Sequence, residues 1–429
     1  MDNLMPFPTG HNLNDRRSGA SAEIFILIII YIGFFSVTRV VGIEELASNA
    51  FAAKYIRVAS IFTAFLGSII ILLKRNALFH FNSPLIFSLF LYFLACILSV
   101  PNSLFPSLSL IKSIEIFQAN LLCLIAITTS QSTSYNFFRI HGRLILLVAV
   151  FIVIESILFP LEAWQTIPGD TPFQGYMLRG VYPSLNPNTV GLIGGIIAAI
   201  HLPKMILLKN KINVILTFFG FAIVVLSYSR SSLIAIIAST LCILYCLRKK
   251  TILLFIVTSI SSFLIFFPSY IDSIYNHLIR GQDIETLSSI VADRPLIWGY
   301  IWDLNHKSLF GLGLGAAFRH PVLSMTGWGH AHNTFFQVMA DLGLAGVLTW
   351  LIMITLIIQR LYKYYKDTNY RFSSNYLSIL SVFIFLLAKS YGHSTLYIFN
   401  YDFIVLVSII IYIEKEHILE KRFKRGQNG

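Results

Sequence analysis

Several arginines lie at the boundaries between apolar runs of the sequence. Arg230 is part of the polar stretch Ser227–Ser232, which separates two apolar runs with almost no loop between them. Arg294 follows Asp293, and Arg179 precedes a turn rich in Pro and Asn. The guanidinium group keeps its charge at neutral pH and can bind phosphate oxygens in a bidentate manner. Together these positions favour binding of an anion such as a diphosphate at a membrane boundary.

A pair of histidines, His330 and His332, comes directly before another apolar run. Histidine exchanges a proton near neutral pH, so either residue is a candidate general base. Two other interpretations stay open, because the pair could contribute to a metal site that lacks an obvious third ligand, or could hold the start of a helix.

Each arginine also has an ordinary structural interpretation. Arg230 can extend from a helix end to the lipid–water interface, Arg294 can pair with Asp293, and Arg179 can be a simple loop residue. The Pro and Asn residues after Arg179 mark a turn into the next apolar run. Of these, Asn188 is predicted to cap the helix that follows, and Asn186 is a candidate for substrate binding.

The composition indicates a membrane protein. The chain has 429 residues, of which 56% are hydrophobic and only 12% charged, and its net charge is +12. Soluble proteins have about 25% charged residues, and the mean hydropathy of +0.73 leaves too little polar surface for a soluble globule. The same values exclude disorder. In such a chain the basic residues report topology, so we expect membrane lipids around it and no nucleic-acid partner.

Apolar runs of about 15–20 residues recur along the chain, which is long enough to cross a bilayer. The runs are continuous and do not alternate with polar residues, so they are expected to form helices. We therefore predict an all-α polytopic membrane protein with about 12 transmembrane helices. The predicted spans are residues 24–40, 57–73, 84–99, 108–127, 143–160, 187–203, 213–228, 231–247, 251–267, 334–358, 375–390 and 398–414.

The distribution of basic residues predicts the orientation of the chain. With both termini in the cytoplasm, about two thirds of the 32 Lys and Arg residues fall on the inner side. The candidate arginines and the histidine pair then all lie on the outer side. The predicted segments are a tail at 1–23, nine spans at 24–267, a long outer loop with short helices at 268–333, three spans at 334–414 and a basic tail at 415–429. We expect the first span to be retained, because no cleavage site is evident.

The sequence offers no sign of a cofactor. The inner connections contain no phosphate-binding loop, so the chain has no motor for ATP-driven transport. The outer segments have few Asp and Glu residues, and no Cys spacing typical of zinc is present. We therefore expect arginine side chains to neutralise a bound diphosphate without a metal.

An ordered set of motifs resembles the bacterial O-antigen ligase and polymerase superfamily. His332-Asn333, followed after nine residues by Gly343 and after two more by Gly346, is similar to its His-[Asn/Ser/Gln]-x9-Gly-x-x-[Gly/Thr/Tyr] pattern. The blocks around Arg179, Arg230 and Arg294 are similar to others of that family and occur in the expected order over about residues 175–350. The sequence departs from the family at two positions. Ser308 stands where Pro is common, and Leu233 follows Arg230 with a spacing of three residues, where ligases often have a spacing of four.

The resemblance implies a membrane glycosyltransferase similar to the GT-C class, in the bacterial inner membrane with a periplasmic active site. It implies transfer of a glycan from undecaprenyl diphosphate to a hydroxyl of the lipid A core, with inversion and without a metal. His332 would be the general base, Arg230 and Arg294 would hold the diphosphate, and Arg179, His330, Asn186 and Asn333 would bind substrate. A repeat-unit polymerase, whose acceptor is another lipid-linked glycan, uses the same site. A solute transporter and a passive scaffold are the alternatives from other classes.

Overall fold

The computed structural model describes residues 25–33, 43–74, 83–128, 136–166, 176–249, 294–324, 329–366 and 373–427. Of the sequence predictions, the span at 251–267, the terminal tail at 1–23 and the loop up to residue 293 lie outside these ranges. Residues 25–33 are helical, where the first span is predicted. The long helices are α2 (Ile43–Lys74), α3 (Pro84–Leu98), α4 (Pro106–Thr128), α5 (Asn136–Leu158), α7 (Pro187–Leu208), α8 (Lys211–Leu226), α9 (Arg230–Cys246), α14 (Thr334–Lys366), α16 (Ser374–Gly392) and α17 (Tyr401–Gln427).

Seven helices in the described ranges are long and apolar enough to cross a membrane. They cover Ile56–Lys74, Pro84–Asn102, Pro106–Thr128, Phe137–Leu158, Pro187–Leu208, Thr334–Lys366 and Ser374–Gly392. Two shorter apolar helices, α8 and α9, lie between them in the chain. The prediction of a mostly helical membrane protein is thus confirmed, whereas the count of twelve spans and the GT-C-like arrangement remain predictions.

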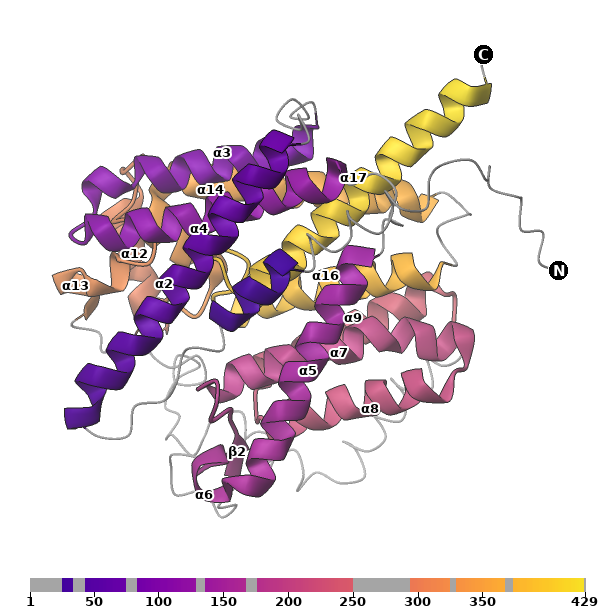
Figure 1. Ribbon diagram of the computed structural model, residues 1–429, viewed down its shortest axis with the longest axis horizontal. Helices are drawn as coiled ribbons and strands as arrows, with labels where there is room; N and C mark the ends of the chain where they lie inside the picture. Colours follow the sequence, from indigo (N-terminus) through magenta and orange to yellow (C-terminus); the bar gives the residue numbers. More distant parts are fainter. Residues whose placement is uncertain are drawn as a thin grey trace.

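The helices pack as two groups that α17 connects (Figure 1). The first group contains α2, α3, α4 and α14, together with α12 (Arg294–Asn305) from the loop before α14. The second contains α5, α7, α8, α9 and α16. Helix α17 contacts α4 of the first group and α5 of the second, and α14 also touches α16 directly. Any site built from α14 and α16 therefore lies where the two groups meet.

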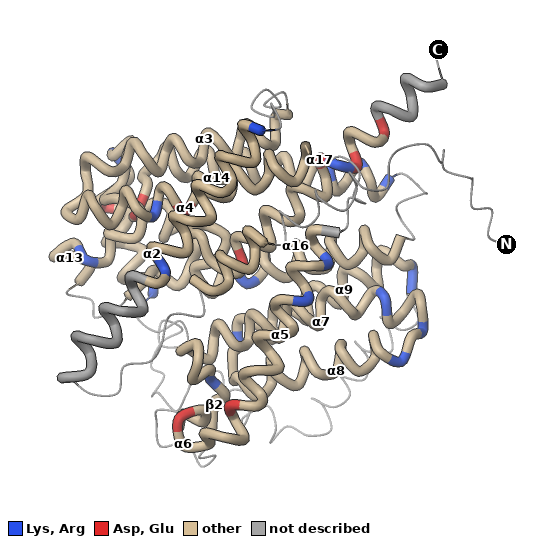
Figure 2. The backbone as a smooth tube through the Cα atoms, viewed as in Figure 1, with Lys and Arg blue, Asp and Glu red and all other residues tan. Residues whose placement is uncertain are grey.

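Exposed apolar side chains and few charges characterise the helix surfaces. On α8, Ile212, Ile215, Phe218 and Val225 are each at least 60% exposed. Their spacing of three to seven residues places them along one stripe, and an exposed apolar stripe of this size is typical of a lipid-facing surface. Figure 2 shows long uncharged stretches, with basic residues grouped at the turn between α7 and α8.

The connection between α5 and α7 departs from the all-α prediction. It contains the short helix α6 (Pro160–Ala163) and two strands, β1 (Trp164–Thr166) and β2 (Tyr176–Leu178). The strands pair antiparallel, with Gln165 opposite Met177. Three-residue strands carry too little hydrophobic periodicity to be recognised in the sequence.

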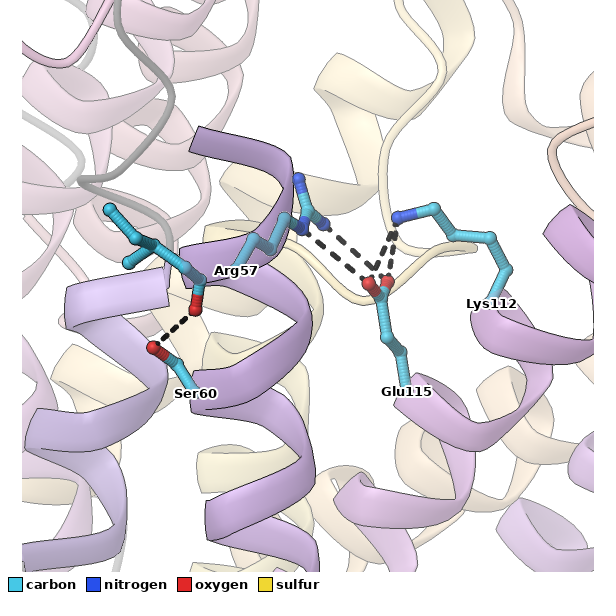
Figure 3. A network of polar contacts seen from close by, with 5 residues as sticks. Arg57, Ser60, Lys112 and Glu115 are labelled. Carbon is cyan, nitrogen blue, oxygen red and sulfur yellow. Dashed lines mark hydrogen bonds and ion pairs between the residues drawn. The ribbon is translucent and has the colours of Figure 1, made fainter. Parts of the chain in front are cut away.

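An ion-pair cluster joins α2 to α4 (Figure 3). The Glu115 carboxylate on α4 accepts hydrogen bonds from Lys112 Nζ at 2.8 and 3.0 Å, and Arg57 Nε on α2 lies 3.4 Å from it. The Glu115 side chain is only 2% exposed. A buried carboxylate is tolerated when cations pair with it, so this cluster explains how a charged residue fits inside the first helix group.

Candidate functional site

The two histidines lie in the short segment that leads into α14. His332 has a backbone φ of +53°, the left-handed region that residues with a side chain seldom adopt. Its backbone N–H donates to Nδ1 of His330 at 3.2 Å, and the two rings lie 3.8 Å apart between centroids. Such backbone conformations persist when the surrounding structure imposes them, and they cluster at functional sites. The segment therefore fixes both imidazoles at the start of a membrane-type helix.

Asn333 acts as the cap of α14. Its side-chain oxygen accepts from the N–H of Phe336 at 3.3 Å, and its Nδ2 donates to the carbonyl of Tyr391 at 3.1 Å. Both ends of the amide are thus used within the protein. The structure gives Asn333, proposed as a substrate-binding residue from the sequence, a structural role beside the histidines.

Helix α12 brings Arg294 to the histidine pair. Trp298 stacks on Phe336 of α14 with centroids 5.0 Å apart and 7° between the rings, and its Nε1 donates to the carbonyl of Ala331 at 2.9 Å. Arg294 stands one turn before Trp298 at the start of α12. Burial and, next, the charge of Arg294 lower the pKa of His330 to about 4. His330 is therefore neutral at pH 7. The suggested partner Asp293 lies outside the described residues.

Helix α14 is broken at Gly343, and a loop segment fills the break. Gly343 has a φ of +66°. In a continuous helix the N–H groups of Leu344 and Ala345 would donate to the carbonyls of residues 340 and 341. Here they donate to the carbonyls of Ser308 and Leu309 at 3.2 and 3.0 Å.

The two carbonyls released by the break find partners in the same loop segment. Ala340 O and Asp341 O accept from the N–H groups of Leu312 and Gly313, each at 2.9 Å. Two hydrogen bonds of the helix are thus replaced by four to the loop.

Glycine is required on both sides of this contact. A Cβ built on Gly311 would lie 2.5 Å from the backbone nitrogen of Leu342, and one on Gly343 would lie 2.8 Å from the nitrogen of Gly311. The spacing between His332 and Gly343 in the sequence motif therefore has a structural explanation. It sets the length of the short helical piece between the histidine and the break.

Arg230 is the first residue of α9 and is close to a buried lysine. Ser229, directly before it, donates to Asn188 Oδ1 of α7 at 3.0 Å. Lys389 of α16 is fully buried, and its Nζ donates to Ser232 Oγ at 2.5 Å and to the carbonyl of Asn188 at 3.2 Å. The polar stretch between the two apolar runs is thus a junction of α7, α9 and α16, with Arg230 at the start of α9 and Lys389 reaching it from α16.

Arg179 and Asn186 have structural contacts in the connection before α7. Arg179 Nε donates to the carbonyl of Glu162 at 2.6 Å. Asn186 caps α7, because its Oδ1 accepts from the N–H of Thr189 at 2.8 Å. The prediction that Asn188 caps this helix is therefore wrong. Asn188 is the second residue of α7, two residues beyond the cap, and its side chain accepts from Ser229 instead.

The sequence reasoning missed two residues of this region, Lys389 and His393. His393 lies just after α16, and its ring stacks on that of His330 with centroids 5.2 Å apart. The available sequence signal was the polar segment 390–395 between two apolar runs, whose contact with the histidine pair spans about 60 residues of chain.

Fold and site together define a mostly helical protein with membrane-type helices and an arginine–histidine site at the start of α14. Residues 215–351 match the family model described as Wzy_C, O-antigen ligase. The resemblance to the O-antigen ligase and polymerase superfamily is thereby confirmed over about a third of the chain. The matched range includes Arg230, Arg294, His330 and His332, and excludes Arg179 and Asn186. No curated protein matches the chain.

Proposed function

We propose that the protein is an O-antigen ligase-type glycosyltransferase of the bacterial inner membrane. The donor is a glycan on undecaprenyl diphosphate, and the acceptor is a hydroxyl group of the lipid A core at the periplasmic face. The observation that carries the proposal is the histidine segment before α14 within the matched family segment. There His332 is held in a left-handed conformation, and its ring contacts that of His330, which lies near Arg294.

In the proposed reaction His332 takes the proton of the acceptor hydroxyl. The acceptor oxygen forms a bond to the anomeric carbon, and the bond from that carbon to the diphosphate oxygen breaks. Arg230 and Arg294 bind the diphosphate and stabilise the negative charge that develops on it. A single displacement of this kind inverts the anomeric configuration. The reaction needs neither a nucleotide nor a metal.

The general base can be tested with His332→Asn in membranes supplied with lipid-linked glycan and a lipid A core acceptor. Asn tolerates the left-handed backbone conformation better than Ala does, so the variant should insert and accumulate. Because general-base catalysis contributes about 100-fold to 10,000-fold, transfer should fall by at least about 100-fold. His306→Asn, directly after α12 and near the same loop, is the control. Transfer at the rate of the unmodified protein by His332→Asn contradicts the assignment.

The acceptor can be tested by deleting the gene and separating the lipopolysaccharide on gels. A ligase predicts loss of all attached O-chains with accumulation of lipid-linked polymer. A core that carries a single repeat unit would instead identify a polymerase. An unchanged pattern would argue against both and for a different acceptor or for transport.

A further inference from the structure

A third imidazole lies against the histidine pair. His393 is the residue directly after α16 and caps its C-terminal end. Its backbone N–H donates to the carbonyl of Lys389 at 3.0 Å. Its ring stacks on His330 with 23° between the planes and lies edge-on to His332, 6.3 Å away between centroids. The three rings come from the start of α14 and the end of α16, where the two helix groups meet.

Both ring nitrogens of His393 are buried, and neither makes a hydrogen bond to the residues that the structure describes. The hydroxyl oxygen of Thr395, two residues further on, is in the same situation. Buried polar atoms in native proteins nearly always have partners, and exceptions often have a functional reason. Here three such atoms belong to one short segment next to the proposed base.

The position of His393 is fixed by other contacts. Thr334 Oγ1 on α14 donates to the carbonyl of Thr395 at 2.8 Å and accepts from its N–H at 2.9 Å. Asn333 Nδ2 donates to the carbonyl of Tyr391 on the other side of His393. The segment from Tyr391 to Thr395 is thus bound to the start of α14 on both sides of His393. These contacts hold the ring of His393 in its position.

The surroundings keep His393 neutral. Burial, followed by repulsion from Lys389 and from His330 and His332 when these are protonated, lowers the pKa of His393 well below its ordinary value. A contact with the backbone of Ser394 opposes the shift. The charged or titratable groups around it come from α16 (Lys389), from the segment before α14 (His330 and His332) and, through His330, from α12 (Arg294).

A neutral imidazole offers one donor and one acceptor, which matches a hydroxyl group and not an anion. The described residues contain no group of three metal-binding side chains with suitable geometry, so the three rings do not form a metal site there.

We propose that His393 binds the acceptor sugar through one of its hydroxyl groups, beside the hydroxyl that His332 deprotonates. This inference rests on the proposed glycosyl transfer. His332 receives the proton, the acceptor oxygen bonds to the anomeric carbon, and the electrons of the broken bond go to the diphosphate. His393 changes neither its charge nor its protonation. Arginine binds the anionic donor, whereas His393 contributes to the recognition of the uncharged acceptor.

The test uses the purified full-length chain in liposomes with undecaprenyl-diphosphate-linked glycan as donor and lipid A core as acceptor, or a second lipid-linked repeat unit if the wild type uses that. His393→Phe keeps a flat ring for packing but removes both nitrogens, and His393→Gln keeps a donor and an acceptor. We expect His393→Phe to raise the KM for the acceptor at least tenfold and leave the KM for the donor unchanged. The KM of His393→Gln for the acceptor should lie between those of His393→Phe and the wild type. His306→Gln serves as the matched control.

The possible outcomes separate the inference from the proposed function. If the wild type transfers the glycan and His393→Phe has an unchanged KM for the acceptor, the role of His393 alone is overturned. A rise in His393→Phe that is confined to the KM for the donor also overturns it. If the wild type transfers the glycan to neither acceptor, both proposals are overturned. If His393→Phe does not fold, as judged by its melting temperature without substrate, His393→Gln decides: a wild-type acceptor KM with a lowered kcat contradicts acceptor binding.

Discussion

At the scale of single residues, the two histidines before α14 differ in ways that suit different tasks. His330 accepts a backbone hydrogen bond at Nδ1, and its pKa is lowered to about 4, so it stays neutral. His332 is held in a left-handed conformation, and its backbone N–H is the donor of that bond. The backbone at His332 therefore sets the position of its ring, and the ring of His330 packs against it. This difference favours His332 as the base.

Replacement of Arg230 tests the binding of the diphosphate. Arg230→Lys keeps the charge but loses the planar pair of donors. Since loss of one stabilising donor costs on the order of 100-fold in rate, we expect transfer to fall by about tenfold or more. Arg248→Lys, just beyond the opposite end of α9, should behave as the wild type. Equal activity of Arg230→Lys and the wild type would show that the fork of the guanidinium is not used.

The pKa of His330 predicts a pH dependence of stability. In the unfolded chain His330 takes up a proton below a pKa of about 6.5, but in the folded protein only near 4. The unfolded state therefore binds more protons between these values, and the free energy of unfolding should decrease as the pH falls from about 6.5 to 4. Melting temperatures over this range check the sign. His330→Asn should flatten the curve, and an unchanged slope in that variant would refute the assignment.

At the scale of elements, the break in α14 links chemistry to architecture. The loop segment 308–313 supplies the hydrogen bonds that the helix gives up at Gly343. Asp341, fully buried beside the break, accepts from the N–H of Ala317 at 3.2 Å and from Gln337 at 3.2 Å. Gln337 in turn accepts from Ala331, next to His332, at 2.8 Å. A continuous set of contacts thus connects the break to the histidine segment.

Gly343→Ala tests this connection without touching a chemical group. An Ala at φ +66° costs about 1–2 kcal/mol from backbone strain alone, and its Cβ would also meet the backbone of Gly311 at 2.8 Å. We expect a lower melting temperature and strongly reduced transfer. Gly299→Ala on α12 is the control, because a Cβ there has nothing within 4 Å. A Gly343→Ala variant as stable and active as the wild type would show that the break is dispensable.

The sequence predicted the positions of most helices but not the details that shape the site. The apolar runs at 108–127 and 187–203 coincide with α4 and α7, because a continuous apolar run of this length is expected to form one membrane-type helix. The break at Gly343 and the contact of His393 with His330 depend on partners about 30 and 60 residues away in the chain. A single sequence does not reveal such pairings, and it also placed the cap of α7 two residues too late. The structure places His330, His332 and Arg294 in one region, and their roles stay predictions.

At the scale of the whole molecule, the site lies between two helix groups that differ in their partners. Helix α14 belongs to the group with α2, α3 and α4, whereas α16 belongs to the group with α7, α8 and α9 (Figure 1). The histidine pair comes from the first group, and Lys389 and His393 come from the second. In the proposed site each group therefore contributes to both substrates, because Arg294 and His332 come from the first group and Arg230 and His393 from the second.

The predicted orientation can be tested by labelling. In a chain whose four cysteines are replaced with alanine, Asn210→Cys at the turn between α7 and α8 should react with an impermeant maleimide only from the cytoplasmic side. Gly329→Cys, exposed beside the histidines, should react only from the periplasmic side. Labelling of both positions from one side would refute the predicted topology.

The divided helix α14 also has a consequence for the membrane around the protein. Bilayers of different thickness change the tilt of membrane helices at modest cost. The loop at 308–313 binds α14 on both sides of Gly343, and Thr334 is tied to the segment after α16. A change of tilt is therefore confined to the part of α14 beyond Ala345, and the histidines keep their place. We therefore expect the transfer rate to change little with the acyl-chain length of the host lipids.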